Sequence, residues 1–396
     1  MESLADKKLR FRIAVSALFF NQGIVFSAWA TRIPDFKKSL ALSDAQLGSL
    51  LFALPVGQLS VMALSGWLTA RFTSRRVVRV AAFIYPLMLC MVRFADSFAS
   101  LFLLLLAFGM SANFTNISIN TQAIDTERIY GKSINASFHG IWSFAGFVGG
   151  VVGAWLVGGG VGVGAHFAAV AAYVWICTLA IVPNLVPTDF PPKPDESGRT
   201  RGALRPTPFI LLLGAITFSC MSCEGTMFNW SIVYFRDVIG APDETARLGF
   251  ISFMSTMAGG RLLADFFINR FGRLAVLRAS GAMITSGMLL AALLPNIAAA
   301  SAGFMLVGFG VSSVVPISYS LAGRSRRMPS GVAIAVVSTI GFFGFLIFPP
   351  LVGFVSELSS LRVSLSMMCC VGIMVALLAP LLRARIAEME KPKARE

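Results

Sequence analysis

A single carboxyl residue, Glu224, lies in an apolar stretch of the sequence, where no other charged residue occurs between Arg205 and Arg236. A carboxylate in apolar surroundings is costly, so it is expected to face a water-filled cavity or a partner group. Burial favours the protonated form of a carboxyl, which makes Glu224 a candidate for reversible protonation. The alternative is a structural carboxyl that hydrogen-bonds to neighbouring helices.

Amide side chains recur at helical spacing upstream of this carboxyl. Asn113, Asn116 and Asn120 are spaced i, i+3 and i+7, which puts three amides on one face of a helix. Asn21 and Gln22 add two more in the first apolar stretch. Amides donate and accept hydrogen bonds without carrying charge, which suits a hydroxyl-rich neutral ligand. Hydrogen bonding between packed helices is the alternative.

Four further residues are candidates for the same binding site: His139, Trp142, Asn229 and Trp230. The histidine could relay a proton or bind a ligand. The tryptophan rings could stack on a sugar ring. The alternatives are packing for the histidine, and packing or anchoring at the membrane interface for each tryptophan.

The elements that must position these residues are membrane-spanning helices. Of 396 residues, 56% are hydrophobic and 13% are charged, against roughly 25% charged in soluble domains. The charge-free run between Lys132 and Asp189 is long enough for two spans of roughly 20 residues each. These runs do not alternate in polarity as barrel strands would. Each span is therefore predicted to be a helix.

Twelve spans are predicted. They cover residues 12–32, 45–69, 77–93, 99–122, 134–157, 166–184, 207–233, 247–268, 274–294, 297–320, 331–355 and 361–382. With the N-terminus inside, 25 of the 33 Lys and Arg residues lie on the inner side. This asymmetry predicts cytoplasmic termini, and it accounts for the net charge of +14 without a nucleic-acid partner.

The spans divide into two related halves. Residues 70–79 and 269–278 are similar at a constant offset of 199 residues. A segment rich in proline and charge, residues 185–206, separates the halves and reads as a linker. The sequence therefore predicts an all-α membrane protein of two pseudo-symmetric six-helix bundles, residues 1–184 and 207–396, joined by a cytoplasmic linker.

The loop from Gly66 to Arg76 resembles the cytoplasmic loop motif of the major facilitator superfamily, and residues 269–273 resemble a second copy. The resemblance implies the twelve-helix major facilitator fold and a cytoplasmic gate. The candidate gate residues are Arg71, Arg75, Arg261, Asp265, Arg270 and Arg273. Arg261 and Asp265 stand i, i+4 apart and could pair. Ala70 and Asn269 replace the acidic residue of the motif, and positive-inside topology alone is the alternative explanation for the loop arginines.

A narrower resemblance is to bacterial inner-membrane transporters related to fucose permease. The segments that carry it are Trp29–Pro34, Asn120–Ala123, Phe138–His139, Glu224–Gly225, Asn229–Ser231, Gly260–Arg261, Gly344 and Pro349–Pro350. Fucose permeases use carboxylates in their first and fourth helices, and these positions fall at Ala30 and Asn116. Neither residue can carry a proton, so if this chain couples to protons, the carrier must lie elsewhere in it.

The resemblance implies a secondary active transporter that works by alternating access. The expected substrate is a small neutral polar solute, sugar-like or a related metabolite, coupled to protons through Glu224. The alternatives are an efflux permease for amphipathic or toxic compounds and a transporter-like solute sensor. We expect a multi-pass monomer of the bacterial inner membrane, with no enzyme activity, cofactor or metal. Four glycines at 146, 149, 150 and 153 should permit close helix approach.

Overall fold

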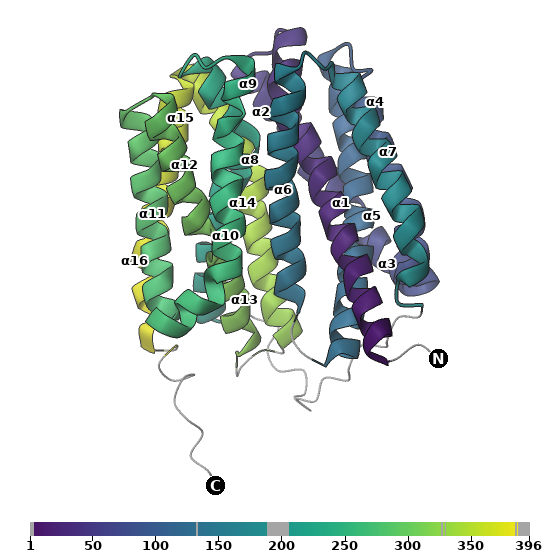
Figure 1. Ribbon diagram of the computed structural model, residues 1–396. Helices are drawn as coiled ribbons and strands as arrows, with labels where there is room; N and C mark the ends of the chain where they lie inside the picture. The colour runs from purple at the N-terminus through teal and green to yellow at the C-terminus, as the bar shows by residue number, and fades with distance from the viewer. Residues whose placement is uncertain are drawn as a thin grey trace. The chain divides into compact units, whose positions relative to one another are not determined.

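The structure is a computed structural model that describes residues 4–131, 134–187, 206–325, 328, 330–384 and 386. These residues form long helices, and no strand occurs among them (Figure 1). The predicted linker, residues 185–206, lies almost entirely outside the described residues. The helical character follows from the apolar sequence, because a helix satisfies its own backbone hydrogen bonds in lipid.

Seven helices cover the six spans predicted for the first half. They are α1 (Leu4–Ser39), α2 (Asp44–Ser60), α3 (Met62–Phe72), α4 (Ser74–Val92), α5 (Phe98–Tyr130), α6 (Asn135–Gly158) and α7 (Val163–Ile181). Helices α2 and α3 share one predicted span and are separated at Val61, where φ is −108°. Capping boxes begin α2 at Ser43 and α5 at Ser97, since each serine hydroxyl accepts an N–H that the helix leaves free.

The second half repeats this pattern. Its helices are α8 (Pro208–Asp237), α9 (Asp243–Ala246), α10 (Leu248–Phe271), α11 (Arg273–Leu293), α12 (Ile297–Ser312), α13 (Val314–Gly323), α14 (Ser330–Leu358), α15 (Leu361–Ser366) and α16 (Met368–Leu378). Short 3₁₀ turns follow α7 at Val182–Asn184 and α16 at Ala379–Leu382. Counting α12 with α13 and α15 with α16 as single spans, the described helices match the twelve predicted ones.

Ten helical stretches are long and apolar enough to cross a membrane by length and composition. Helices α4 and α10 are not among these ten, and both carry charges within their length. Arg75, Arg76 and Arg79 lie in the first turns of α4. Arg261, Asp265 and Arg270 lie in α10. These charges lower the hydropathy of both helices.

The internal repeat is visible in the backbone of the two arginine-rich loops. Thr73 joins α3 to α4 with φ 74° and ψ 146°, and Gly272 joins α10 to α11 with φ 80° and ψ 156°. The two positions are 199 residues apart, as the sequence repeat requires. This conformation suits glycine and is rare for a β-branched residue. The two loops of the sequence repeat therefore share the same backbone turn.

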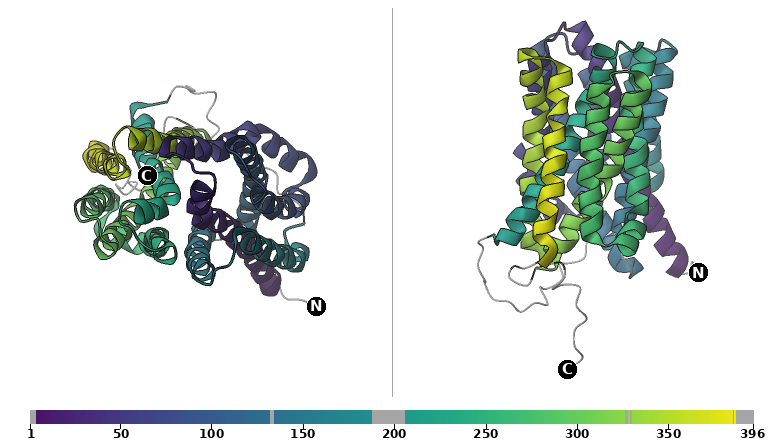
Figure 2. Two further views of the ribbon diagram at one scale, coloured as in Figure 1. Left: turned by 90° about the horizontal axis from the view of Figure 1, so that it is seen from above. Right: turned by 90° about the vertical axis from the view of Figure 1, so that its left-hand side faces the viewer.

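Packing groups the described residues into two compact units. The first comprises Met1–Pro191 with Ile232–Met254, and the second comprises Pro192–Ser231 with Ser255–Glu396. In the first unit α1 packs on α5, α6 and α7, and α5 packs on α2 and α4; seen from above in Figure 2, these purple-to-blue helices run nearly end-on. In the second, α11 packs on α12 and α16, and α14 packs on α13 and α15.

Glycine allows the closest helix contacts in each unit. A Cβ on Gly149 of α6 would lie 1.8 Å from Ser27 Oγ of α1. A Cβ on Gly344 of α14 would lie 2.4 Å from the carbonyl oxygen of Phe218 in α8. Both distances are impossible for a larger residue, so the small side chain is what lets the backbones approach. The glycines of the fifth span thus have the packing role expected from their spacing.

Candidate functional site

Glu224 of α8 forms an ion pair with Arg261 of α10. One terminal guanidinium nitrogen lies 3.4 Å from both carboxylate oxygens. The carboxylate residue is only 6% exposed, and its partner is half-buried. The thiol of Cys220, one turn earlier on α8, lies 3.8 Å from Glu224 Oε1 and 3.4 Å from the carbonyl oxygen of Val311 in α12. A carboxylate, a guanidinium and a thiol thus meet inside the second unit.

Sequence reasoning found the carboxylate but not its partner. Arg261 was expected to pair with Asp265 in a cytoplasmic gate, whereas the ion pair seen in the structure joins it to Glu224, and Asp265 is exposed. The sequence did contain an indication of this partner. Apart from Arg247 at its first residue, the span predicted over residues 247–268 contains one arginine, Arg261. Two opposite charges inside the membrane are expected to form an ion pair.

Asn229 and Trp230 follow on the same helix and make local and packing contacts. The Asn229 amide donates to the carbonyl oxygen of Gly225 at 2.7 Å. The Trp230 indole N–H donates to the carbonyl oxygen of Pro349 in α14 at 3.0 Å. Trp230 is fully buried, so in this structure it fastens α8 to α14, while Asn229 stays partly exposed.

The amide face of α5 is graded in exposure. Asn113 is buried, Asn116 is exposed and Asn120 is half-buried. The Asn120 amide donates to Oδ1 and to the carbonyl oxygen of Asn116, both at 2.8 Å. The buried Oδ1 of Asn113 has no hydrogen-bond partner among the described residues. The helical spacing therefore brings Asn116 and Asn120 together, with Asn113 deeper in the first unit.

The two amides of α1 lie inside the first unit. Asn21 is 4% exposed, and neither polar atom of its side chain has a partner among the described residues. It lies with Gln22 on a cavity of about 10 Å³ whose other lining residues come from α1, α4, α5 and α7: Leu18, Ala82, Tyr85, Thr115, Ile119 and Val174. A volume of this size holds roughly one water molecule. Asn21 therefore faces the interior of its own helix bundle.

His139 and Trp142 lie on the face of α6 that contacts α1. The His139 ring is exposed and meets the Phe19 ring edge-on at 5.2 Å between centroids. The Trp142 ring is tilted against Phe26 at 5.6 Å. Both side chains are therefore fixed by aromatic contacts to α1, and the histidine keeps an accessible edge.

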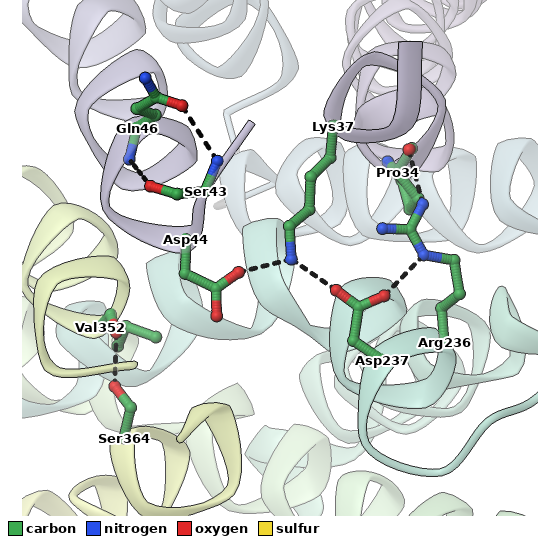
Figure 3. Close-up of polar contacts among 9 residues, drawn as sticks. All are labelled: Pro34, Lys37, Ser43, Asp44, Gln46, Arg236, Asp237, Val352 and Ser364. Atoms are coloured by element: carbon green, nitrogen blue, oxygen red, sulfur yellow. Dashed lines mark hydrogen bonds and ion pairs between the residues drawn. The ribbon is translucent and has the colours of Figure 1, made fainter. Parts of the chain in front are cut away.

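A second group of charged residues, here called the helix-end cluster, lies in the first unit. Its members are Arg32, Asp35, Lys37, Asp44, His166, Arg236, Asp237 and Arg247. Figure 3 shows four of its members, Lys37, Asp44, Arg236 and Asp237. Lys37 Nζ lies 2.5 Å from Asp44 Oδ1 and 2.5 Å from Asp237 Oδ2. Arg236 donates to Asp237 Oδ1 at 2.7 Å and to the carbonyl oxygen of Pro34 at 2.6 Å. The ends of α1 and α8 and the start of α2 are joined in this way.

The cluster continues to α7 and to Arg247, which lies between α9 and α10. Asp35 lies 2.9 Å from an Arg247 nitrogen and 3.5 Å from Arg32. Arg32 also donates to His166 Nδ1 at 3.1 Å and to the carbonyl oxygen of Val161 at 2.7 Å. Arg32 and Arg247 are almost fully buried, so their charges depend on these partners. These arginines stand at the ends of the predicted spans 12–32 and 247–268, and sequence reasoning missed the cluster, which joins residues as far apart as Asp35 and Arg247.

The arginine-rich loops make fewer contacts. Arg75 donates to the carbonyl oxygen of Pro183 at 3.1 Å, which ties α4 to the turn after α7. Arg71 and Arg270, at equivalent positions of the repeat, are both exposed, and Arg273 is half-buried. Among the described residues, no group of three or more His, Cys, Asp or Glu side chains is placed to hold a metal ion.

Relatives of this chain extend over nearly its whole length. Residues 13–328 match the family model described as Major Facilitator Superfamily. An uncharacterised MFS-type transporter of Yersinia pestis is 33% identical over 379 residues, which cover 94% of this chain and 95% of that protein. Membrane protein MosC of Rhizobium meliloti is 32% identical over 369 residues, which cover 92% of this chain and 88% of that protein.

Solved transporter structures share the fold at low sequence identity. A bacterial homologue of the human lysosomal transporter Spinster superposes with a TM-score of 0.74 at 16% identity, covering 96% of this chain and 98% of that one. The nucleoside transporter NupG gives 0.70 at 16% identity, with 96% and 100% covered. The fucose:proton symporter FucP of E. coli gives 0.63 at 14% identity, with 93% and 97% covered.

Proposed function

Because this chain belongs to the major facilitator superfamily, and is therefore a multi-pass membrane transporter and not an enzyme, we propose that it moves a small neutral polar solute together with protons. It works by alternating access between two six-helix bundles, residues 1–184 and 207–396. It acts as a monomer in the bacterial inner membrane with both termini in the cytoplasm, the orientation that the Lys and Arg distribution favours.

The observation that carries the proposal is the buried pair of Glu224 and Arg261. An ionised carboxylate binds the guanidinium 3.4 Å away, whereas a protonated one loses that attraction. Proton uptake at Glu224 therefore weakens a link between α8 and α10. A site that changes its helix contacts with its protonation state is what coupling a proton to a conformational change requires.

Amides support a neutral polar substrate. Asn116, Asn120 and Gln22 keep polar atoms partly accessible on α5 and α1, and amides bind hydroxyl groups without requiring a charge. The full proposed binding set is Asn21, Gln22, Asn113, Asn116, Asn120, His139, Trp142, Asn229 and Trp230. Nucleosides and fucose, the substrates in the names of two transporters with this fold, are hydroxyl-rich in the same way.

Gating is assigned to the two ends of the helices. The helix-end cluster closes the outer side by joining α1 and α2 to the end of α8 and to Arg247. The loop residues Arg71, Arg75, Arg270 and Arg273, with Asp265, act at the inner side. In this scheme Arg261 belongs with Glu224 because the two side chains are paired.

The test begins with a thermal-shift screen of the purified protein against sugars and nucleosides, because a ligand that binds the folded state raises the melting temperature. Uptake of the best ligand into proteoliposomes is then measured with and without an imposed pH gradient. We expect the gradient to accelerate uptake by the native protein. Glu224→Gln should bind the ligand and lose this acceleration.

The matched control is Glu357→Gln, which neutralises an exposed carboxyl at the end of α14. It should retain the response to the gradient. If Glu224→Gln responds to the pH gradient as strongly as the native protein does, Glu224 is not the coupling residue.

A further inference from the structure

An apolar groove runs along the outside of three helices of the first unit. It has a volume of about 430 Å³ and is lined by residues of α3, α4 and α5: Leu68, Phe72, Arg76, Val77, Val80, Ala81, Ile84, Ser111 and Phe114. The volume falls within the range of roughly 300–1,000 Å³ typical of small-molecule sites. Phe72, Val80 and Ile84 are each more than 40% exposed. A membrane protein presents such a surface to lipid.

Positive charge gathers at one end of this groove. Arg76 is the single charged side chain in the lining. Arg79 lies one turn further along α4, and Arg71 lies at the end of α3, just before the loop that leads into α4. Over the part of the chain that the structure describes, no ion pair involves Arg76 or Arg79. The stretch of sequence that holds these arginines contains no acid, since no Asp or Glu occurs between Asp44 and Asp96. This end of the groove therefore carries positive charge.

The length of the groove matches one leaflet of a bilayer. Arg76 and Ile84 are eight residues apart on α4, a rise of about 12 Å at 1.5 Å per residue. The hydrocarbon of one leaflet is about 15 Å thick. Trp67 is 57% exposed and precedes Phe72, the first aromatic residue of the groove, on α3. An exposed tryptophan is the kind of side chain that marks the membrane interface. The rim thus lies at headgroup level and the apolar part at acyl-chain level.

We infer that this groove binds an anionic phospholipid of the cytoplasmic leaflet, with an acyl chain along α4 and the phosphate against Arg76. The inference depends on the proposed orientation of the termini, and it is independent of the substrate and of proton coupling. Basic pockets between helices on the cytoplasmic side are suited to anionic headgroups. The missing acid of the loop motif, at Ala70, leaves the arginines available for such a ligand.

The test measures the melting temperature of the full chain in detergent with added phosphatidylglycerol or with phosphatidylcholine of the same acyl chains. We expect phosphatidylglycerol to raise it more, because binding stabilises the folded state. Arg76→Gln should weaken phosphatidylglycerol binding roughly fivefold, the effect of about 1 kcal/mol per basic side chain at an anionic surface. Arg76→Lys should retain most of the shift.

The internal repeat provides a matched control. The counterpart of Arg76 is Ala275, so the second loop lacks this arginine, whereas Arg278 is the exposed counterpart of Arg79. Arg278→Gln removes the same charge and should leave the phosphatidylglycerol shift unchanged. Each variant is also melted without lipid, which separates a folding defect from lost binding.

A second variant tests the apolar part of the groove. Val80→Trp fills the groove at a residue that is 61% exposed and leaves the charge unchanged, so it should reduce the shifts from both lipids. Equal shifts from the two lipids, a native response in Arg76→Gln, or a native response in Val80→Trp would each overturn the inference. Inorganic phosphate should have no such effect, and an equal shift from phosphate would show an ion site without a lipid.

Discussion

In the proposed mechanism, proton coupling depends on Glu224 and Arg261. Each is a charge at membrane depth, and each is tolerable there because the other lies 3.4 Å away. Burying two charges is expensive, and their attraction repays this only when both are present. The pair therefore adds little to the stability of the fold. It suits a switch, because one proton neutralises the carboxylate and so removes one of the two charges.

A double-variant cycle tests this pairing. Arg261→Gln leaves a carboxylate without its counter-charge and should destabilise the protein by about 3 kcal/mol, the cost of breaking a buried pair from one side. The double variant Glu224→Gln with Arg261→Gln should recover much of that loss. The measurement is the melting temperature of the three variants in detergent.

Additive effects in this cycle would show that the two side chains do not interact. Asp265→Asn is the companion control. It changes an exposed carboxyl one turn further along α10, and it should leave the coupling between Glu224 and Arg261 unchanged.

The sequence reveals which residues are unusual more readily than it reveals where they point. Glu224 could be singled out because it is the only charge in its span. Its partner lies 37 residues away on another helix, and helical periodicity carries no information across that distance. The same limit applies to Asn21, whose depth was predictable but whose direction, into the first unit, depends on how α1 packs against α4, α5 and α7.

At the scale of the elements, the turn at Thr73 stands out. Its backbone has φ 74° and ψ 146°, a region that is nearly exclusive to glycine and costs of order 1–3 kcal/mol for other residues. The equivalent turn in the second half has Gly272. The fold therefore keeps the same turn in both repeats although only one of them has the residue that fits it.

Thr73→Gly should stabilise the protein by about 1 kcal/mol, because glycine adopts this conformation without steric cost. The reciprocal change, Gly272→Thr, should destabilise it by a similar amount. Thermal unfolding of both variants measures the difference. A lower melting temperature for Thr73→Gly would contradict the prediction and would assign a packing role to the threonine side chain.

Hydropathy predicted the helices well for a simple reason. In lipid the main requirement on a span is a sufficiently long apolar stretch, and ten of the helical stretches meet it by length and composition. The interruptions at Val61 and Ser313 and the short helix α9 were not predictable, because they depend on local backbone geometry and tertiary contacts that hydropathy does not encode.

At the scale of the whole molecule, the helix-end cluster joins segments that lie far apart in the chain. Lys37 bridges Asp44 and Asp237, and Asp35 bridges Arg32 and Arg247. Any movement that separates α1 from the end of α8 must break several of these ion pairs together. The cluster therefore sets a free-energy cost for opening this end of the helices.

Lys37→Gln should make the outer end open more often, because two carboxylates lose their shared cation. The reporter is Thr31→Cys, which replaces a fully buried residue one turn before Asp35, in a background with the native cysteines changed to serine. A membrane-impermeant thiol reagent added from outside should label it severalfold faster in the Lys37→Gln variant. Lys38→Gln is the matched control, since it removes the same charge from an exposed neighbour.

Equal labelling rates in the Lys37→Gln and Lys38→Gln variants would contradict a gating role for the cluster. Faster labelling in both would indicate an effect of net charge at the outer surface, without a specific contribution from the ion pairs.

The thiol of Cys220 has a use that follows from its position. It is fully buried and lies 3.8 Å from Glu224, and only the thiolate, which needs hydration to form, reacts with alkylating agents. The rate at which small alkylating agents modify Cys220 therefore measures how often water reaches the Glu224 carboxylate. Mass spectrometry of Cys220 alkylation at a series of pH values would show how often water enters the proposed coupling site, without any engineered label.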